Sequence, residues 1–212
     1  MKRILSILLA VLLLAAFSAC AGSKTPAQNE TIAPPVTDAP EKAENTAAPD
    51  VTTTADKTLV VVFSATGTTK GVAEKIAAIE NADLYEIQAA QPYTDDDLNW
   101  NDQNSRTTLE QNDPTARPKI SGEPLTLDGY SKIYIGYPIW WGEEPRIMDT
   151  FVESYDFDGI TMIPFCTSGG SGIGRSGQNL AEKAGSGNWL DGQRFGGSVS
   201  KAELETWISS LK

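Results

Sequence analysis

The sequence has no histidine, and only two of its 212 residues are cysteine. Without histidine the chain cannot form a Ser-His-Asp triad, a Cys-His nucleophile pair or a zinc site of mixed cysteine and histidine ligands. Two cysteines, Cys20 and Cys166, are too few for a disulfide framework. We therefore expect no catalytic residue and no metal ligand. We interpret Cys166 as a small buried side chain, with a redox thiol as the alternative.

Basic residues are also scarce, since 17 Lys and Arg stand against 28 Asp and Glu and give a formal net charge of −11. Nucleic-acid binding draws most of its affinity from basic residues on phosphates, so this balance excludes nucleic acid as a partner. The same charge favours steering toward a basic redox partner protein. Long apolar runs are equally rare. The apolar run Ile4–Phe17 is shorter than the roughly 20 residues of a membrane span.

This apolar run belongs to an N-terminal pattern that is typical of bacterial export signals. Met1–Arg3 supplies positive charge, and Ser18, Ala19 and Cys20 close the run with small residues that resemble a lipobox. We therefore predict a lipoprotein signal peptide over residues 1–20, with Cys20 lipidated and the chain exported and lipid-anchored to a membrane of the bacterial cell envelope. An ordinary secretory peptide and an uncleaved anchor are the alternatives.

Residues 21–57 are rich in Pro, Thr, Ala, Asn, Asp and Glu and contain few apolar side chains. Such a composition cannot bury enough apolar surface to fold, so we predict a disordered tether. From residue 58 to residue 212, apolar runs alternate with stretches of helical periodicity, as in a parallel sheet with helices on both faces. We predict a single α/β domain of three layers over this part of the chain.

The positions of the expected elements follow from hydrophobic periodicity and from capping residues. Strands are predicted at 59–63, 83–87, 132–137, 160–165 and 192–195. Helices are predicted at 68–80, from Pro145 onward with Glu143 and Glu144 at the positive end of its dipole, at 176–184, and at 201–211 with Ser200 as its cap.

Between residues 89 and 118 the chain carries neither a strand pattern nor a helix pattern, and it is polar and rich in proline. Irregular connections of this length are uncommon unless they are functional or disordered. Tyr93, Trp100 and Arg106 favour an ordered flap, while a solvated excursion with one anchoring tryptophan is equally compatible with the sequence.

The loop after the first predicted strand, Ser64-Ala65-Thr66-Gly67-Thr68-Thr69, carries four hydroxyl side chains and leads into a helix. Backbone N–H groups at a helix start are unpaired and lie at the positive end of the helix dipole, an arrangement that binds phosphate. An ordinary helix cap needs only one Ser or Thr. The pattern G-x-x-x-x-G-K-[ST] of nucleotide hydrolases is absent, as is G-x-G-x-x-G, so we predict neutral donors around a phosphate monoester.

Two further loops leave the carboxyl ends of predicted strands, and in an open parallel sheet these ends share one edge. The loop Pro138-Ile139-Trp140-Trp141-Gly142 has adjacent tryptophans that point in different directions, so at least one should lie at the surface as a stacking platform. Packing of both under the flap is the alternative. The loop Thr167-Ser168-Gly169-Gly170-Ser171-Gly172 either lets backbone approach a planar ligand or serves as a flexible connector.

A phosphate cradle, an aromatic platform and a glycine-rich rim at one edge suit a ring system that is linked to a phosphate, as in flavin mononucleotide (FMN). At these residues the sequence resembles the flavodoxin family, and in particular its exported lipoproteins. The resemblance is carried by FSATGTTKGVAEKIA, by GYPIWWGEEPRIM, by PFCTSGGSGIGRS and by the segment 93–120. It covers residues 58–212, which is nearly all of the predicted domain.

The resemblance implies a flavodoxin-like fold, an open parallel five-stranded sheet in the order 2-1-3-4-5, with FMN as the cofactor at the switch point. In familiar flavodoxins a tyrosine from the last loop stacks on the ring, and glycine and serine stand there in this sequence. The cofactor-binding residues that it implies are Ser64, Ala65, Thr66, Gly67, Thr68 and Thr69 for the phosphate, Pro138, Ile139, Trp140, Trp141 and Gly142 for one side of the ring, and Thr167, Ser168, Gly169 and Gly170 for its other edge.

The function implied by the resemblance is electron transfer by an FMN protein that is tethered outside the cytoplasmic membrane and docks a redox partner. The negative net charge is expected to lower the potential of the bound flavin, although distant charges are screened beyond about 8 Å. Two alternatives stay open. One is an FMN-dependent reductase that uses NAD(P)H and a quinone or a similar acceptor, and the other is a lipoprotein that binds a different phosphorylated ligand or a protein.

Overall fold

The computed structural model describes residues 56–211 of the chain. The predicted signal peptide over residues 1–20, with Cys20, lies outside the described residues, as does the predicted tether up to residue 55. The first strand starts at Lys57, one residue before the predicted domain boundary.

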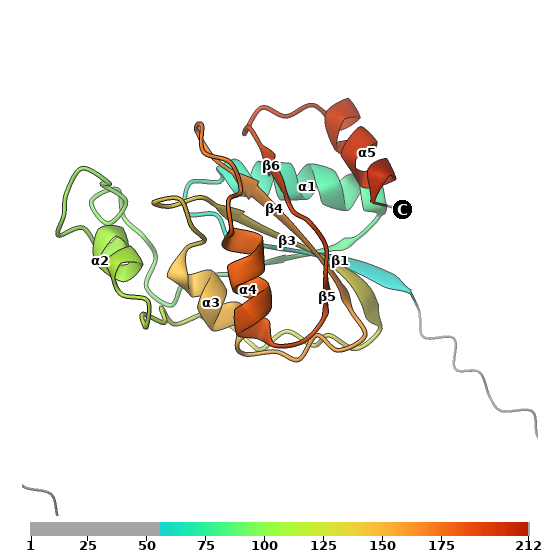
Figure 1. Cartoon of the computed structure of the whole chain (residues 1–212), viewed down its shortest axis with the longest axis horizontal. Helices are drawn as coiled ribbons and strands as arrows, with labels where there is room; N and C mark the ends of the chain where they lie inside the picture. The colour runs from blue at the N-terminus through green and yellow to red at the C-terminus, as the bar shows by residue number, and fades with distance from the viewer. Residues whose placement is uncertain (1–55, 212) are drawn as a thin grey trace, which may run out of the picture. The chain divides into compact units, whose positions relative to one another are not determined.

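Figure 1 shows a twisted parallel sheet with helices on both of its faces. Its strands are β1 (Lys57–Val62), β2 (Asp83–Glu86), β3 (Tyr130–Pro138), β4 (Thr161–Thr167), β5 (Asn188–Trp189) and β6 (Gln193–Phe195). They lie in the order β2-β1-β3-β4-β5, β6 also pairs with β4, and all of these pairs are parallel. The predicted order 2-1-3-4-5 is therefore confirmed.

Four of the helices form the two outer layers of the fold. The helices are α1 (Thr68–Glu80), α2 (Arg106–Asn112), α3 (Arg146–Val152), α4 (Ser176–Ala184) and α5 (Lys201–Ser210). Helices α1 and α5 cover one face of the sheet, α3 and α4 cover the other, and α2 stands apart at the side of α3 (Figure 1). No helix within residues 56–211 has both the length and the apolar character needed to cross a membrane.

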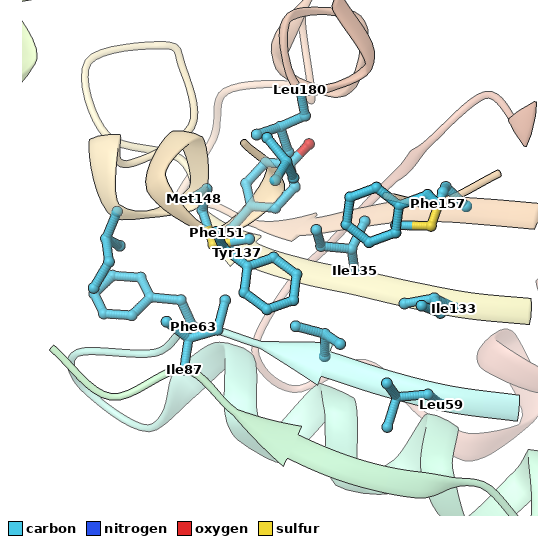
Figure 2. Packing of buried hydrophobic residues seen from close by; sticks show 14 of the residues in the cluster. Leu59, Phe63, Ile87, Ile133, Ile135, Tyr137, Met148, Phe151, Phe157 and Leu180 are labelled. Atoms are coloured by element: carbon cyan, nitrogen blue, oxygen red, sulfur yellow. The ribbon is translucent and has the colours of Figure 1, made fainter. Parts of the chain in front are cut away.

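Alternation along the strands divides the buried side chains into two cores, one on each face of the sheet. Leu59 and Val61 pack on the α3 and α4 side, whereas Val60 and Val62 pack on the α1 and α5 side. Figure 2 shows the first of these cores, where side chains of β1 and β3 meet Phe151 of α3 and residues of α4. The apolar residues of each helix therefore fix which face it covers.

The fifth position of the sheet is filled by two short strands in succession, of which the sequence predicted only β6. Strand β5 pairs with the start of β4, and β6 pairs with its end. Between them, a Cβ atom at Gly192 would come within 2.4 Å of Ile173 and 2.9 Å of the Pro164 carbonyl oxygen. Glycine is therefore required where the chain passes close to Pro164 between the two segments.

Helix boundaries agree with the predictions except near Pro145 and at the end of α5, which stops at Ser210, one residue before the predicted end. Pro145 has ψ of 141°, which is extended backbone, so α3 begins one residue later at Arg146. Ser200 caps α5 as predicted, because its hydroxyl oxygen accepts a hydrogen bond from the Glu203 N–H and the Glu203 carboxylate accepts one from the Ser200 N–H. Helix α2 was not predicted as a helix, since its seven residues present no long apolar stripe.

Candidate functional site

The three predicted loops meet at the carboxyl edge of the sheet, and two hydrogen bonds join them directly. The Thr69 and Thr167 hydroxyls lie 2.8 Å apart in the buried interior and connect the first loop to the third. The Ile139 N–H donates to the Thr167 carbonyl oxygen at 2.9 Å and connects the second loop to the third. Thr167 therefore holds all three loops at one place.

In the first loop, the chain turns into α1 through a left-handed residue. Gly67 is the N-cap and has φ of 81°, a conformation that glycine adopts without steric cost. Among the described residues no side chain caps the helix, so its first N–H groups stay available for a ligand. The space where a Cβ of Gly67 would lie is open. The local geometry therefore suits an anion at the start of α1.

The hydroxyl groups of the first loop divide into two kinds. Thr66 and Thr68 are exposed, with their hydroxyl oxygens 3.2 Å apart, and half-buried Ala65 packs against the core. Thr69 is buried and its hydroxyl is already paired with Thr167. The Ser64 hydroxyl is buried as well, yet it has no hydrogen-bond partner within the described part of the chain. Because an unpaired buried hydroxyl is costly, Ser64 is the donor most in need of a ligand.

The second loop is a tight turn that presents its two tryptophans differently. Trp140 and Glu143 exchange two backbone hydrogen bonds, of 2.9 and 3.0 Å, around Trp141 and Gly142. Those two central residues have φ of 49° and 85°, as in a type I′ turn. A left-handed tryptophan is unusual and strained. Pro138 ends β3 at the base of this turn.

One of the two tryptophans is at the surface, as predicted. Trp141 is 43% exposed. Trp140 instead packs edge-on against Phe63 of the core and against Tyr93 of residues 89–118, with ring centroids 5.7 and 5.3 Å away. The second loop is therefore fixed by the inner tryptophan and leaves the outer aromatic face to solvent.

The third loop is anchored by Arg194, a residue that was not predicted from the sequence. Arg194 of β6 donates from Nη2 to the Ser168 carbonyl oxygen at 2.7 Å and from Nε to the Ser168 hydroxyl at 3.2 Å. Gly169 and Gly170 are exposed, and no described residue other than their chain neighbours comes within 4 Å of where their Cβ atoms would be. The loop is thus anchored at Ser168 and open at its glycines. No sequence signal marked Arg194, because only strand pairing brings it near.

Cys166, the last buried residue before the third loop, is a small apolar core residue, as interpreted from the sequence. It is fully buried. Burial raises the pKa of its thiol to about 12, since desolvation outweighs the lowering effect of Arg194. A protonated, inaccessible thiol is a poor nucleophile and a poor redox group.

Residues 89–118, which we call the flap, are ordered by polar contacts and include helix α2. Its ends meet where Ala89 pairs with Ile120. The Arg106 guanidinium lies 4.0 Å from the centroid of the Tyr93 ring and forms an ion pair with Glu110 at 2.7 Å. The Tyr93 hydroxyl donates to Glu110 at 2.7 Å. Of the two sequence interpretations, the ordered flap is confirmed.

The flap is attached to the second loop through Gln111 of α2. Its side-chain amide donates to the carbonyl oxygens of Trp140 and Glu144, both at 3.2 Å. The main-chain carbonyl oxygen of Gln111 accepts a hydrogen bond of 2.9 Å from the Arg146 guanidinium. Flap, tryptophan loop and α3 therefore form one connected unit, and none of these contacts is visible as a sequence motif.

Next to the second loop lies a group of buried and half-buried charges that we call the α3 charge cluster. Its members are Arg117, Glu144, Arg146, Asp149 and Lys183. Glu144 lies just before the N-cap of α3, at the end of the helix where it was predicted, and its carboxylate also pairs with Lys183 of α4 at 3.1 Å. Burial raises the pKa of Asp149 to about 6, against the opposing effect of Lys183. The cluster fixes α3 and hence the tryptophan turn that precedes it.

The second loop and the flap enclose a cavity of about 380 Å³. Its lining residues are Thr66, Leu98, Trp100, Thr107, Ile139, Trp140 and Trp141. A cavity of this size and apolar character is typical of small-molecule sites. A larger cavity of about 720 Å³ lies between β6 and α5, and none of the predicted site residues lines it. The smaller cavity is therefore the one that residues of the first and second loops line, together with the flap.

A doubly wound parallel sheet with three loops that form a candidate ligand site at its switch point is the architecture of nucleotide-binding proteins of the flavodoxin class. Residues 57–211 match the family model for flavodoxin. The chain belongs to the flavodoxin family. No curated protein gave a significant match.

Solved structures with this fold include two candidate flavoproteins, from Bacteroides eggerthii DSM 20697 and Bacteroides uniformis ATCC 8492. Each is 43% identical to this chain, with TM-scores of 0.69 and 0.70, and the match covers 73% of this chain and 97% or 98% of theirs. A flavoprotein from Lactobacillus acidophilus NCFM, crystallised in complex with FMN, is 23% identical with a TM-score of 0.55. That match covers 73% of this chain and 99% of the other.

Proposed function

We propose that this chain is an FMN-binding electron-transfer protein that is exported, anchored to the cell envelope through a lipid on Cys20, and docked by a redox partner. The observation that carries the proposal is the buried hydroxyl of Ser64, which has no hydrogen-bond partner among residues 56–211, beside a helix start that no side chain of those residues caps. A phosphate at this position accepts hydrogen bonds from that hydroxyl and from the free N–H groups. The donor set therefore fits the phosphate of FMN.

The remaining residues suit the rest of such a ligand. Thr66 and Thr68 add exposed hydroxyl donors to the phosphate site, and the left-handed Gly67 lets the backbone approach it. Trp141 offers an apolar face to the ring, while the Gly169 and Gly170 backbone is open to its polar edge. When bound, FMN supplies the electron-transfer chemistry, and the chain supplies position and electrostatics.

Charge supports the proposed partner, and sequence supports the proposed location. The chain has a net charge of −11, so a basic redox protein would be attracted to it, most strongly at low salt. Arg194 is a cation next to the third loop, and it opposes the effect of this negative charge on the ring. A lipid on Cys20 would hold the domain near the membrane.

The test is a titration of the purified full chain with FMN and with riboflavin, which lacks the phosphate. We expect Ser64→Ala and Thr66→Ala to weaken FMN by about tenfold or more, since hydrogen bonds to charged groups contribute about 1.5–3 kcal/mol. Riboflavin affinity should stay unchanged. Ser209→Ala is the matched control, because this exposed hydroxyl lies on α5 and bonds only to the Glu205 carbonyl oxygen.

Two outcomes would redirect the proposal. If the wild-type chain binds no FMN at saturating concentration, the fold serves a different phosphorylated ligand or a protein. If FMN binds and the loaded chain oxidises NAD(P)H with steady turnover on a quinone, the chain is a reductase instead of a carrier. Reduction by a partner protein without such turnover is the result that the proposal expects.

A further inference from the structure

The cavity between the second loop and the flap has an unusual wall. Trp100, from the flap, is 70% exposed although it lines this cavity. Trp141, from the second loop, lines the same cavity and is 43% exposed. Two large aromatic faces in solvent are costly unless something covers them. Their common cavity is where a flat ligand would cover both.

Trp100 is exposed on a backbone that is well fixed. The Thr107 hydroxyl donates to the Asp97 carbonyl oxygen at 2.7 Å, and the Thr108 hydroxyl donates to the Asp102 carbonyl oxygen at 2.9 Å. These two bonds hold the turn on both sides of Trp100, and both threonines are buried. The tryptophan is therefore presented by a rigid support, as a preformed binding surface requires.

The same cavity is continuous with the phosphate site. Thr66 belongs to the first loop and also lines the cavity. Within residues 56–211, the lining comes from the first loop, the second loop and the flap, and no residue of the third loop contributes. The third loop, residues 167–172, also has no aromatic side chain. A ligand with its phosphate on the first loop can thus place its ring between the second loop and the flap.

We propose that Trp100 is a ring-binding residue, which forms with Trp141 the two aromatic walls that receive the flavin ring. The inference rests on the proposed function and adds a residue from outside the three loops. The flap thereby supplies an aromatic surface that the glycine-rich third loop lacks. The first loop then binds the phosphate, while the second loop and the flap bind the ring. A substitution can therefore weaken one of these two contacts without weakening the other.

The experiment titrates FMN and riboflavin into the full chain and into Trp100→Ala, Trp100→Phe and Leu109→Ala. We expect Trp100→Ala to weaken both ligands by the same factor, about tenfold, because stacking on an aromatic side chain contributes equally to both. Trp100→Phe should recover most of the loss. Leu109→Ala is the matched control, since Leu109 is a flap residue that is 55% exposed and does not line the cavity.

Thermal unfolding of each variant without flavin separates binding from folding. A side chain as exposed as Trp100 contributes little to packing, so its variants should unfold at the wild-type temperature. If Trp100→Ala binds both ligands like the wild type, the inference is wrong while the proposed function stands. If it weakens FMN and leaves riboflavin unchanged, Trp100 acts on the phosphate and the inference is again wrong. If the wild type binds neither ligand, the proposed function itself fails.

Discussion

On the α1 and α5 side of the sheet the core is apolar, whereas on the α3 and α4 side an apolar core continues into buried charges. Glu144, Arg146 and Asp149 are buried on that second side. Among the described residues no charged side chain is buried on the first side, where ion pairs such as Lys201 with Glu205 are exposed. The two layers thus bury the same sheet by different means.

The difference follows from what each layer has to position. Helix α1 needs only an exposed N-terminus at Gly67, which the packing of its apolar residues on the sheet provides. Helix α3 follows a strained turn at Trp141, and Gln111, Glu144 and Arg146 hold that turn against the flap and α4. Buried charges add little net stability compared with apolar residues, but they impose directional contacts. The buried charges of the α3 and α4 layer therefore fix the position of α3 and of the turn at Trp141.

The largest expected effect comes from breaking the α3 charge cluster. Lys183→Met removes the cation that lies 3.1 Å from Glu144 and 3.4 Å from Asp149, and it leaves both carboxylates buried. We expect a loss of about 3 kcal/mol or more in the free energy of unfolding, measured in urea at pH 7. Lys201→Met, on the other layer, removes an exposed pair and should change stability very little. Equal losses for the two lysines would contradict the comparison.

A smaller loss is expected when the apolar layer is overpacked. A Cβ atom at Gly136 of β3 would lie 2.2 Å from the Phe165 ring, on the α1 and α5 side. Gly136→Ala should therefore cost about 2–3 kcal/mol in the free energy of unfolding. Gly71→Ala, in α1 with open space around the new methyl, should instead add about 0.5–1 kcal/mol. Chemical denaturation should show a lower free energy of unfolding than the wild type for Gly136→Ala and a higher one for Gly71→Ala.

The smallest expected effect is a pH dependence that belongs to the charged layer alone. Because burial raises the pKa of Asp149 from 3.8 to about 6, the folded state binds more protons than the unfolded state between those values. Stability therefore falls as pH rises from about 4 to about 6, by about 1–2 kcal/mol. The surrounding groups are Arg117, Glu144, Arg146 and Lys183.

Asp149→Asn isolates this contribution, because asparagine keeps the shape and cannot titrate. The difference in unfolding free energy between wild type and variant, measured at several pH values, should shift in favour of the variant as pH rises through this range. A difference that is constant with pH would show that Asp149 has an ordinary pKa in the folded protein.

Much of this architecture was predictable from local patterns. Apolar runs in β1, β3 and β4 and helical periodicity in α1 and α5 are strong signals, and they predicted the strands, the helices and the layers. The strand order was predicted from the resemblance to the flavodoxin family and is confirmed. Weak elements were missed. Helix α2 has seven residues without an apolar stripe, and β5 has two residues that form a strand only because β4 lies beside them.

The candidate site was predictable to the level of its three loops, which the structure joins through Thr167. The sequence could not show which hydroxyl groups are free to bind a ligand. Ser64 and Thr69 both carry a hydroxyl in the same loop, yet Thr69 is paired with Thr167 and Ser64 has no partner in the described residues. Trp100 was noted only as a flap residue and Arg194 was not noted at all, because contacts between distant segments bring them to the site.

The sequence alone determined the alternation of strands and helices, the hydroxyl-rich turn into α1, the paired tryptophans and the acidic net charge. These features depend on residues within about one element of each other, where periodicity, capping and turn chemistry act directly. Only the tertiary structure decided which tryptophan faces solvent, where the flap lies and how the α3 charges pair. Those outcomes depend on burial and on contacts between segments that are far apart in the sequence, as Thr69 and Thr167 are at 98 positions apart, and no local pattern encodes them.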